Sequence, residues 1–177
     1  MTAETRIFNF RFLPAFVLAA VLFASPAFGA WSKEADIAGG WSFDYTRTVQ
    51  VMALAGFERQ LKENLYIRIE PTVEYMRSKD GQALFDGGAT LVARLKSPMG
   101  KVTPFLDFGA GANGVSRKEF EGRELGGNFL FDLVMGVGAE FKNGLAVSYR
   151  YRHLSNGGLF KVNNGLDSGY VMVGYKF

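Results

Sequence analysis

The sequence predicts an all-β protein, an eight-stranded antiparallel transmembrane β-barrel of the outer membrane. Three observations predict this fold. Apolar and polar residues alternate over segments of about ten residues, which is typical of strands that face lipid on one side. Polar turns separate these segments, and the 22 glycines are spread among them. After residue 29 no run of about 20 apolar residues occurs, so we expect no membrane-spanning helix there.

Residues 1–29 have the features of a secretory signal peptide. Two arginines give a positive start, an apolar stretch follows over residues 13–23, and Ala27 and Gly29 fit the small-residue cleavage pattern. An uncleaved membrane anchor is the alternative interpretation, but the apolar stretch is short for one. We therefore expect cleavage after residue 29 and a single barrel domain over residues 30–177.

The alternation of apolar and polar residues places the strands. The clearest segment is 129–141, where Phe129, Phe131 and Leu133 share one face and Leu130 and Asp132 share the other. The first segment is the least defined. The expected strands lie near residues 35–44, 48–58, 65–74, 83–96, 106–112, 129–141, 145–155 and 167–177.

The connections differ in length in a regular way. Residues 142–144 and 96–101 form short turns, whereas residues 114–127 and 156–166 form longer loops. Outer-membrane barrels keep short turns on the periplasmic side and long loops outside. The end of the strand over 145–155 is therefore expected near the outer leaflet.

Charged residues of both signs fall on the face that alternation assigns to the barrel interior. Buried charges must be paired, so we expect an interior polar network. A water-soluble barrel would invert this arrangement and expose a large apolar surface. The residues expected to face inward are Arg68, Glu70, Asp107, Asp132, Glu140, Arg150 and Arg152.

A candidate catalytic group lies in the last two expected strands. His153 is the only histidine of the chain, Ser155 follows two residues later, and Asp167 begins the last strand. Nucleophilic hydrolysis uses a nucleophile, a base and an orienting acid of these residue types. Alternation places all three on the apolar, lipid-facing side of their strands, unless a bulge near the site reverses the register. The pattern predicts an enzyme that attacks lipid from within the membrane.

Composition excludes several other functions. The chain has no cysteine, so it has no thiolate metal site, and one histidine is too few for a histidine-rich metal site. We expect no metal and no cofactor. The net charge of +3 is mild, and no basic helix or aromatic RNA-binding motif is present. No nucleic-acid partner is therefore expected.

The segment HLSNGGL at residues 153–159, followed by NNGLDS at 163–168, resembles the lipid A 3-O-deacylase (PagL) family. The resemblance implies an outer-membrane barrel that removes the 3-linked acyl chain from lipid A of lipopolysaccharide. It implies Ser155 as the nucleophile, His153 as the general base and Asp167 as the orienting acid, where the family pattern has glutamate. The candidates for the oxyanion hole and its support are Asn163, Asn156 and Gly158.

Two alternatives stay open from the sequence. One is a small barrel without enzymatic activity that serves adhesion or envelope integrity. The other is an esterase that acts on a different lipid, such as a phospholipid of the outer membrane. The sequence also leaves open whether the barrel is a monomer or a homodimer.

Overall fold

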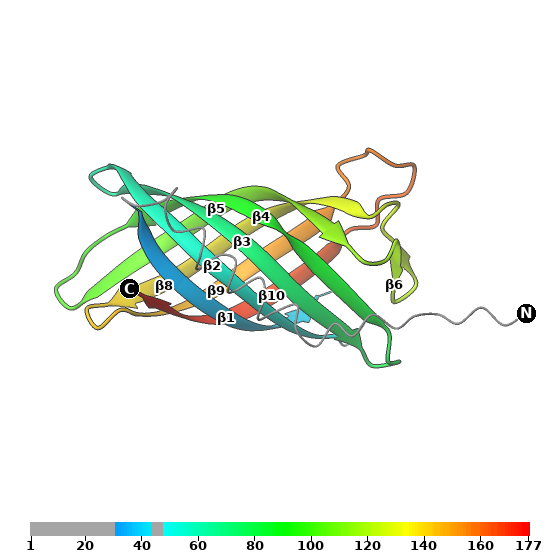
Figure 1. Ribbon diagram of the computed structural model, residues 1–177, viewed down its shortest axis with the longest axis horizontal. Coiled ribbons are helices and arrows are strands. Elements are labelled where there is room, and N and C mark those ends of the chain that lie inside the picture. The colour runs from blue at the N-terminus through cyan, green and yellow to red at the C-terminus, as the bar shows by residue number, and fades with distance from the viewer. Residues whose placement is uncertain (1–30, 44–47) are drawn as a thin grey trace, which may run out of the picture.

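A computed structural model describes residues 31–43 and 48–177 of the chain. The predicted signal peptide, residues 1–29, lies outside these described residues. Within the described part, eight long strands form a closed antiparallel barrel (Figure 1). The predicted fold class is confirmed.

The barrel strands are 11 to 15 residues long. Strands of about 9 to 11 residues already cross the hydrocarbon core of a bilayer when tilted, so these are long enough. Their bounds are β1 Ser32–Ser42, β2 Thr48–Lys62, β3 Leu65–Ser78, β4 Ala83–Lys96, β5 Val102–Val115, β8 Phe129–Phe141, β9 Leu145–Ser155 and β10 Leu166–Lys176. A small hairpin, β6 Glu119–Phe120 and β7 Arg123–Glu124, lies between β5 and β8.

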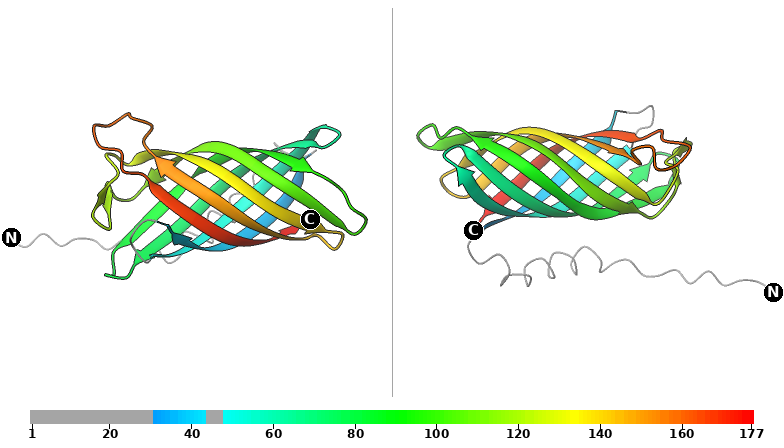
Figure 2. Two further views of the ribbon diagram at one scale, coloured as in Figure 1. Left: turned by 180° about the vertical axis from the view of Figure 1, so that it is seen from behind. Right: turned by 90° about the horizontal axis from the view of Figure 1, so that it is seen from above.

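The barrel strands that are consecutive in the chain are also neighbours in the sheet, and β10 closes the barrel against β1. One end of the barrel carries the C-terminus and the short turns that follow β2, β4 and β8 (Figures 1 and 2). The other end carries the β6–β7 hairpin and the loop between β9 and β10. The predicted short turns over 142–144 and 96–101 and the predicted loops over 114–127 and 156–166 thus lie at opposite ends, although the connection between β3 and β4, residues 79–82, is a short one at the long-loop end.

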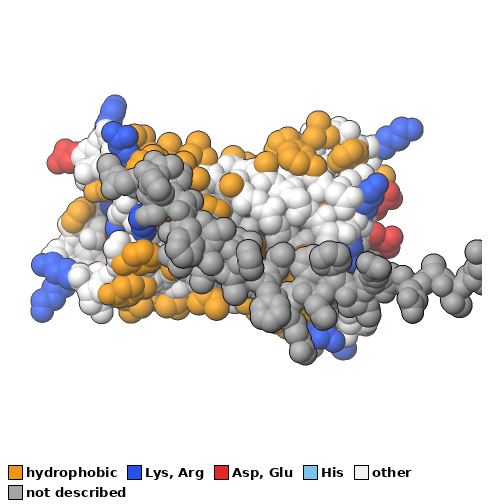
Figure 3. Space-filling model, in the orientation of Figure 1, with side chains coloured by type: hydrophobic (Ala, Val, Ile, Leu, Met, Phe, Trp, Pro, Cys, Tyr) orange, Lys and Arg blue, Asp and Glu red, His pale blue; other side chains and the backbone are white. Residues whose placement is uncertain are grey.

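The outer wall of the barrel is apolar. Along β8, Phe129, Leu133 and Val137 are 44%, 56% and 53% exposed, whereas Leu130 and Asp132 are buried. On the face seen in Figure 3, hydrophobic side chains lie along the wall and charged side chains gather at the two ends. A wall of this kind suits contact with lipid and is unfavourable in water.

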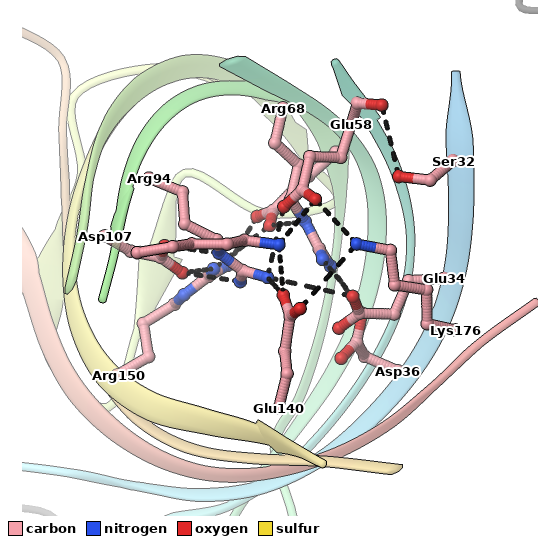
Figure 4. Close-up of polar contacts among 12 residues, drawn as sticks. Ser32, Glu34, Asp36, Glu58, Arg68, Arg94, Asp107, Glu140, Arg150 and Lys176 are labelled. Atoms are coloured by element: carbon pink, nitrogen blue, oxygen red, sulfur yellow. Dashed lines mark hydrogen bonds and ion pairs between the residues drawn. The ribbon is translucent and has the colours of Figure 1, made fainter. Parts of the chain in front are cut away.

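Charged side chains fill the barrel interior and pair across it (Figure 4). Arg68 on β3 contacts Glu34 on β1 at 2.8 Å, and Arg150 on β9 contacts Glu70 on β3 at 2.6 Å. Because a buried charge is costly unless it is paired, such contacts tie strands together across the barrel. All residues predicted to face inward take part in these ion pairs: Arg68, Glu70, Asp107, Asp132, Glu140, Arg150 and Arg152.

A hydrophobic cluster closes the interior at the long-loop end. Phe120 and Leu125 reach it from the β6–β7 region, and Leu154 reaches it from β9. Leu154 lies between His153 and Ser155, so its inward side chain anchors the strand end that carries both. The cluster comprises Met76, Leu84, Val115, Phe120, Leu125, Leu130, Leu154 and Leu166.

The strand predictions differ from the structure mainly in their limits. The second strand continues to Lys62 and ends with a register shift between Gln60 and Lys62. The fifth strand begins at Val102, and the predicted loop over 114–127 contains the β6–β7 hairpin. Residues 31–43 and 48–177 include no helix of the length and hydrophobicity that a membrane crossing requires.

Candidate active site

His153 and Asp167 are in direct contact on the outer wall. They lie opposite each other in the register of β9 and β10, and His153 Nδ1 is 2.7 Å from Asp167 Oδ1. Their side chains are 33% and 35% exposed, whereas the neighbours Arg152 and Leu154 point into the barrel and are buried. The structure therefore places this acid–imidazole pair on the lipid-facing side, as the alternation predicts.

Ser155 ends β9 and is half-buried. It is two residues beyond His153 on the same face, and its register partner on β8 is Phe131. Among the described residues, neither the Ser155 hydroxyl nor His153 Nε2 has a hydrogen-bond partner. The structure thus joins His153 to Asp167 and places Ser155 beside them, without a hydrogen bond between serine and imidazole.

Tyr151 is a site residue that the sequence pattern did not identify. Its hydroxyl donates to Asp167 Oδ1 at 2.5 Å, the same oxygen that contacts His153. The only signal in the sequence is its position two residues before His153, which puts it on the same face of the strand. Its bond to Asp167 depends on the register of β9 and β10, which the sequence alone does not give.

The backbone of Asp167 is held by β1. Its carbonyl oxygen accepts the Phe43 N–H at 2.9 Å and the Ser42 hydroxyl at 3.1 Å. The acid is therefore fixed through its main chain by one neighbouring strand and through its side chain by the other.

Asn156 organises the loop that follows Ser155. It is fully buried, and its amide nitrogen donates to the carbonyl of Leu125 at 2.8 Å and that of Val162 at 2.6 Å. Its backbone N–H donates to Asn163 Oδ1 at 2.8 Å, and its own Oδ1 accepts the Gly158 N–H at 2.9 Å. The backbone N–H groups of Asn156 and Gly158 are thus engaged within the loop.

The β6–β7 hairpin supports the segment just before Asp167. Arg123 Nη1 donates to the carbonyls of Asn164 at 3.0 Å and Gly165 at 2.9 Å. Gly165 has a φ of +62°, and an added Cβ there would lie 3.1 Å from His153 Cε1. A glycine therefore suits this position, because it takes this φ without strain and lets the loop backbone approach the imidazole.

No three histidine, cysteine, aspartate or glutamate side chains in the described part of the chain come together as a metal site. The chemistry available at the outer wall is that of a hydroxyl, an imidazole and a carboxylate, with amide groups in the adjoining loop.

Comparison with known proteins identifies relatives of this chain. The family model described as Lipid A 3-O-deacylase (PagL) matches residues 18–176. The Lipid A deacylase PagL of Pseudomonas aeruginosa is 34% identical over 67 residues, a match that covers 38% of this chain and 39% of that protein. The matched part is thus well under half of that relative's length.

Solved structures share the barrel fold. The crystal structure of the outer membrane enzyme PagL has a TM-score of 0.69 at 20% identity, and the match covers 80% of this chain and 98% of that one. Neisserial surface protein A has a TM-score of 0.51 at 19% identity, with 82% and 94% covered. The residues that match the family model include all eight barrel strands and both His153 and Asp167. This chain therefore belongs to the lipid A 3-O-deacylase (PagL) family.

Proposed function

We propose that this protein hydrolyses the 3-linked acyl ester of lipid A, with Ser155 as nucleophile, His153 as general base and Asp167 as orienting acid. The observation that carries the proposal is the 2.7 Å contact between His153 Nδ1 and Asp167 Oδ1 on the lipid-facing wall. Polar and ionisable groups are costly at such a surface, and an acid–imidazole pair there is better explained by chemistry than by stability.

In the proposed reaction, Ser155 Oγ attacks the ester carbonyl carbon and its proton passes to His153 Nε2. The tetrahedral intermediate then collapses, the bond to the sugar 3-oxygen breaks, and the imidazolium returns the proton to that oxygen. Water attacks the acyl-serine by the reverse proton transfers and releases a fatty acid. The Asp167 carboxylate accepts a hydrogen bond from Nδ1–H, which keeps the proton on Nδ1 and leaves the Nε2 lone pair free to act as the base.

The Asn163 amide is the proposed oxyanion donor. Its Oδ1 already accepts the Asn156 N–H, so its Nδ2 is the part of the side chain left to donate. Asn156 and Gly158 support it by fixing the loop, since their N–H groups are engaged there. Preorganised donors of this kind typically contribute about 10²- to 10³-fold to the rate.

The position of the site along the barrel fits an acyl ester near the lipid headgroups. The barrel belongs to the outer membrane, and the site lies at the end that carries the long loops. Acyl chains can lie against the apolar wall while the ester stands level with Ser155, close enough to the loops for water to enter. One chain supplies all three proposed residues, so the reaction needs no second copy.

The test is to express the wild type, Ser155→Ala and His153→Gln in cells whose lipid A retains its 3-linked acyl chains. Lipid A is then analysed by mass spectrometry. We expect the loss of one 3-linked acyl chain with the wild type and no loss with either variant. Ser148→Ala is the matched control, because Ser148 is on the same strand but on the inward phase, and it should deacylate like the wild type.

Each alternative has its own outcome in this experiment. Deacylation by a folded Ser155→Ala barrel would rule out the proposed nucleophile. Intact lipid A together with Ser155-dependent release of fatty acid from phospholipid would point to a different lipid substrate. A folded wild-type barrel that binds lipid A and cleaves no ester would favour the barrel without enzymatic activity.

A further inference from the structure

We propose that Tyr151 is a positioning residue of the site: its hydroxyl locks the Asp167 carboxylate, so that the carboxylate holds the imidazole of His153 with Nδ1 protonated. This inference rests on the proposed function, because it assigns Tyr151 a role in the same reaction. Tyr151 acts through Asp167 and His153 and does not touch the reacting atoms.

The geometry at one carboxylate oxygen carries the proposal. Asp167 Oδ1 accepts the Tyr151 hydroxyl at 2.5 Å and lies 2.7 Å from His153 Nδ1. A carboxylate oxygen can accept two hydrogen bonds, and bonds to an ionised acceptor are short and strong. Two donors from neighbouring positions on β9 therefore fix the rotation of the carboxylate about its own side-chain bonds.

The Tyr151 hydroxyl adds a second restraint at the carboxylate oxygen that contacts His153. The Asp167 side chain is 35% exposed at the barrel wall. Without the tyrosine, the carboxylate could turn so that Oδ1 leaves the plane of the imidazole. The catalytic value of an orienting acid depends on holding one tautomer of the base, so loss of this orientation should lower the rate.

Tyr151 is itself well placed to hold the carboxylate. Its ring stacks on that of Phe43 with centroids 6.1 Å apart and an interplanar angle of 24°. Gly169 is its register partner on β10, and an added Cβ there would lie 2.7 Å from Phe43 Cζ. The glycine thus leaves the space beside Tyr151 that the Phe43 ring fills. A side chain held on a strand by ring stacking is a more rigid support than one on a loop.

The test is Tyr151→Phe, which removes the hydroxyl and keeps the stacked ring. The chain has one histidine, so histidine labelled with ¹⁵N reports on His153 alone. In detergent-solubilised wild type we expect the ring ¹⁵N shifts of the neutral imidazole to show protonation at Nδ1. In Tyr151→Phe we expect the population to move toward protonation at Nε2, the nitrogen that must accept the serine proton.

The kinetic expectation is a fall in kcat of about tenfold with KM unchanged, the size of effect that follows from losing one hydrogen bond to a charged group. Tyr175→Phe is the matched control, because Tyr175 is also a phenol on the outer wall, 56% exposed and at the opposite end of β10. It should match the wild type in both measurements.

A Tyr151→Phe variant with wild-type kcat and unchanged His153 shifts would overturn the proposal. A lower kcat with unchanged shifts would also overturn it, because the tyrosine would then act by another route. The spectrum needs no turnover, so it decides the role of Tyr151 at His153 separately from activity. Failure of the proposed function would instead appear as unchanged deacylation by Ser155→Ala.

Discussion

Asp167 shows how much of the site depends on single contacts. Its carboxylate contacts both His153 and Tyr151, and its carbonyl is held by Ser42 and Phe43. A shift of one residue in the register between β9 and β10 would turn the side chain to the barrel interior. The acid is therefore both a member of the β9–β10 pairing and the residue that orients the proposed base.

Asp167→Asn tests the orienting role. The amide can present its NH₂ group to Nδ1, which favours the wrong tautomer of His153. We expect deacylation to fall by up to about 10⁴-fold, the loss seen when the orienting acid of a Ser-His-Asp triad is replaced by asparagine. The rate is measured on purified lipid A in detergent. Asp167→Glu keeps the charge and should lose less activity than Asp167→Asn, and equal losses would contradict an electrostatic role.

Gly165→Ala tests the close approach of the loop to the base. A side chain at a φ of +62° costs about 1 to 2 kcal/mol, and its Cβ would lie 3.1 Å from His153 Cε1. We expect lower thermal stability and a several-fold lower rate. Gly100→Ala is the control, because Gly100 has a φ of +64° with no atom within 4 Å of an added Cβ. Gly100→Ala should be less stable than the wild type and equally active. Equal activity losses in Gly100→Ala and Gly165→Ala would show that backbone strain alone lowers the rate.

The positions of the site residues could be predicted in part. Alternation placed His153, Ser155 and Asp167 on the outer face, because side-chain direction on a strand follows residue number. Predicting the contact between His153 and Asp167 requires the register of β9 and β10, which alternation does not give. The hydrogen bond from Tyr151 to Asp167 depends on the same register. Whether the Ser155 hydroxyl forms a hydrogen bond with the imidazole is a matter of side-chain geometry, which no periodic pattern encodes.

At the scale of elements, the β6–β7 hairpin is the part that shapes the site from outside the barrel wall. It joins the β9–β10 loop through Arg123, and Leu125 accepts a hydrogen bond from Asn156. Figure 1 shows the hairpin and this loop at the same end of the barrel. Two connections that are far apart in sequence thus stabilise each other next to His153.

Arg123→Ala tests this support. The variant loses two hydrogen bonds to the backbone just before Asp167, so we expect a deacylation rate about 3- to 10-fold lower, with the barrel still folded. The control is Arg117→Ala, since Arg117 is an exposed cation of the same connection. If both variants lost activity equally, loop charge would be the cause and the proposed support would be wrong.

The long strands and the hairpin differ in how well the sequence reveals them. Apolar and polar residues alternate along most of the barrel strands, so an expected segment overlaps each of the eight. β6 and β7 have two residues each, too few for any alternation. Their position depends on Phe120 and Leu125 entering a cluster built by distant strands. Such contacts between distant segments cannot be read from local pattern.

At the scale of the whole molecule, the interior network gives the barrel a rigid frame. Arg68 is fully buried and contacts Glu34 at 2.8 Å, Asp36 at 2.6 Å and Glu70 at 2.5 Å. The predicted inward charges were correct because polar residues fill one phase of each strand. The pairing between them could not be predicted, since it depends on the stagger of strands around the closed barrel.

Arg68→Met tests the network. Removing the cation leaves buried carboxylates without their partner, and we expect the free energy of unfolding to fall by about 3 to 5 kcal/mol. Unfolding is followed by urea titration in detergent or lipid vesicles. Arg59→Met, at an exposed position on β2, should change the free energy of unfolding by about 0.5 kcal/mol or less. A wild-type unfolding curve for Arg68→Met would show that the network adds little stability.

We propose above all that Ser155 is a nucleophile activated on the lipid-facing wall. The most direct measurement is labelling of the purified barrel with a fluorophosphonate, followed by peptide mass spectrometry. We expect one adduct, on Ser155, which disappears in His153→Gln. An active wild-type barrel that takes up no label on Ser155, or a His153→Gln barrel labelled as fast as the wild type, would contradict it.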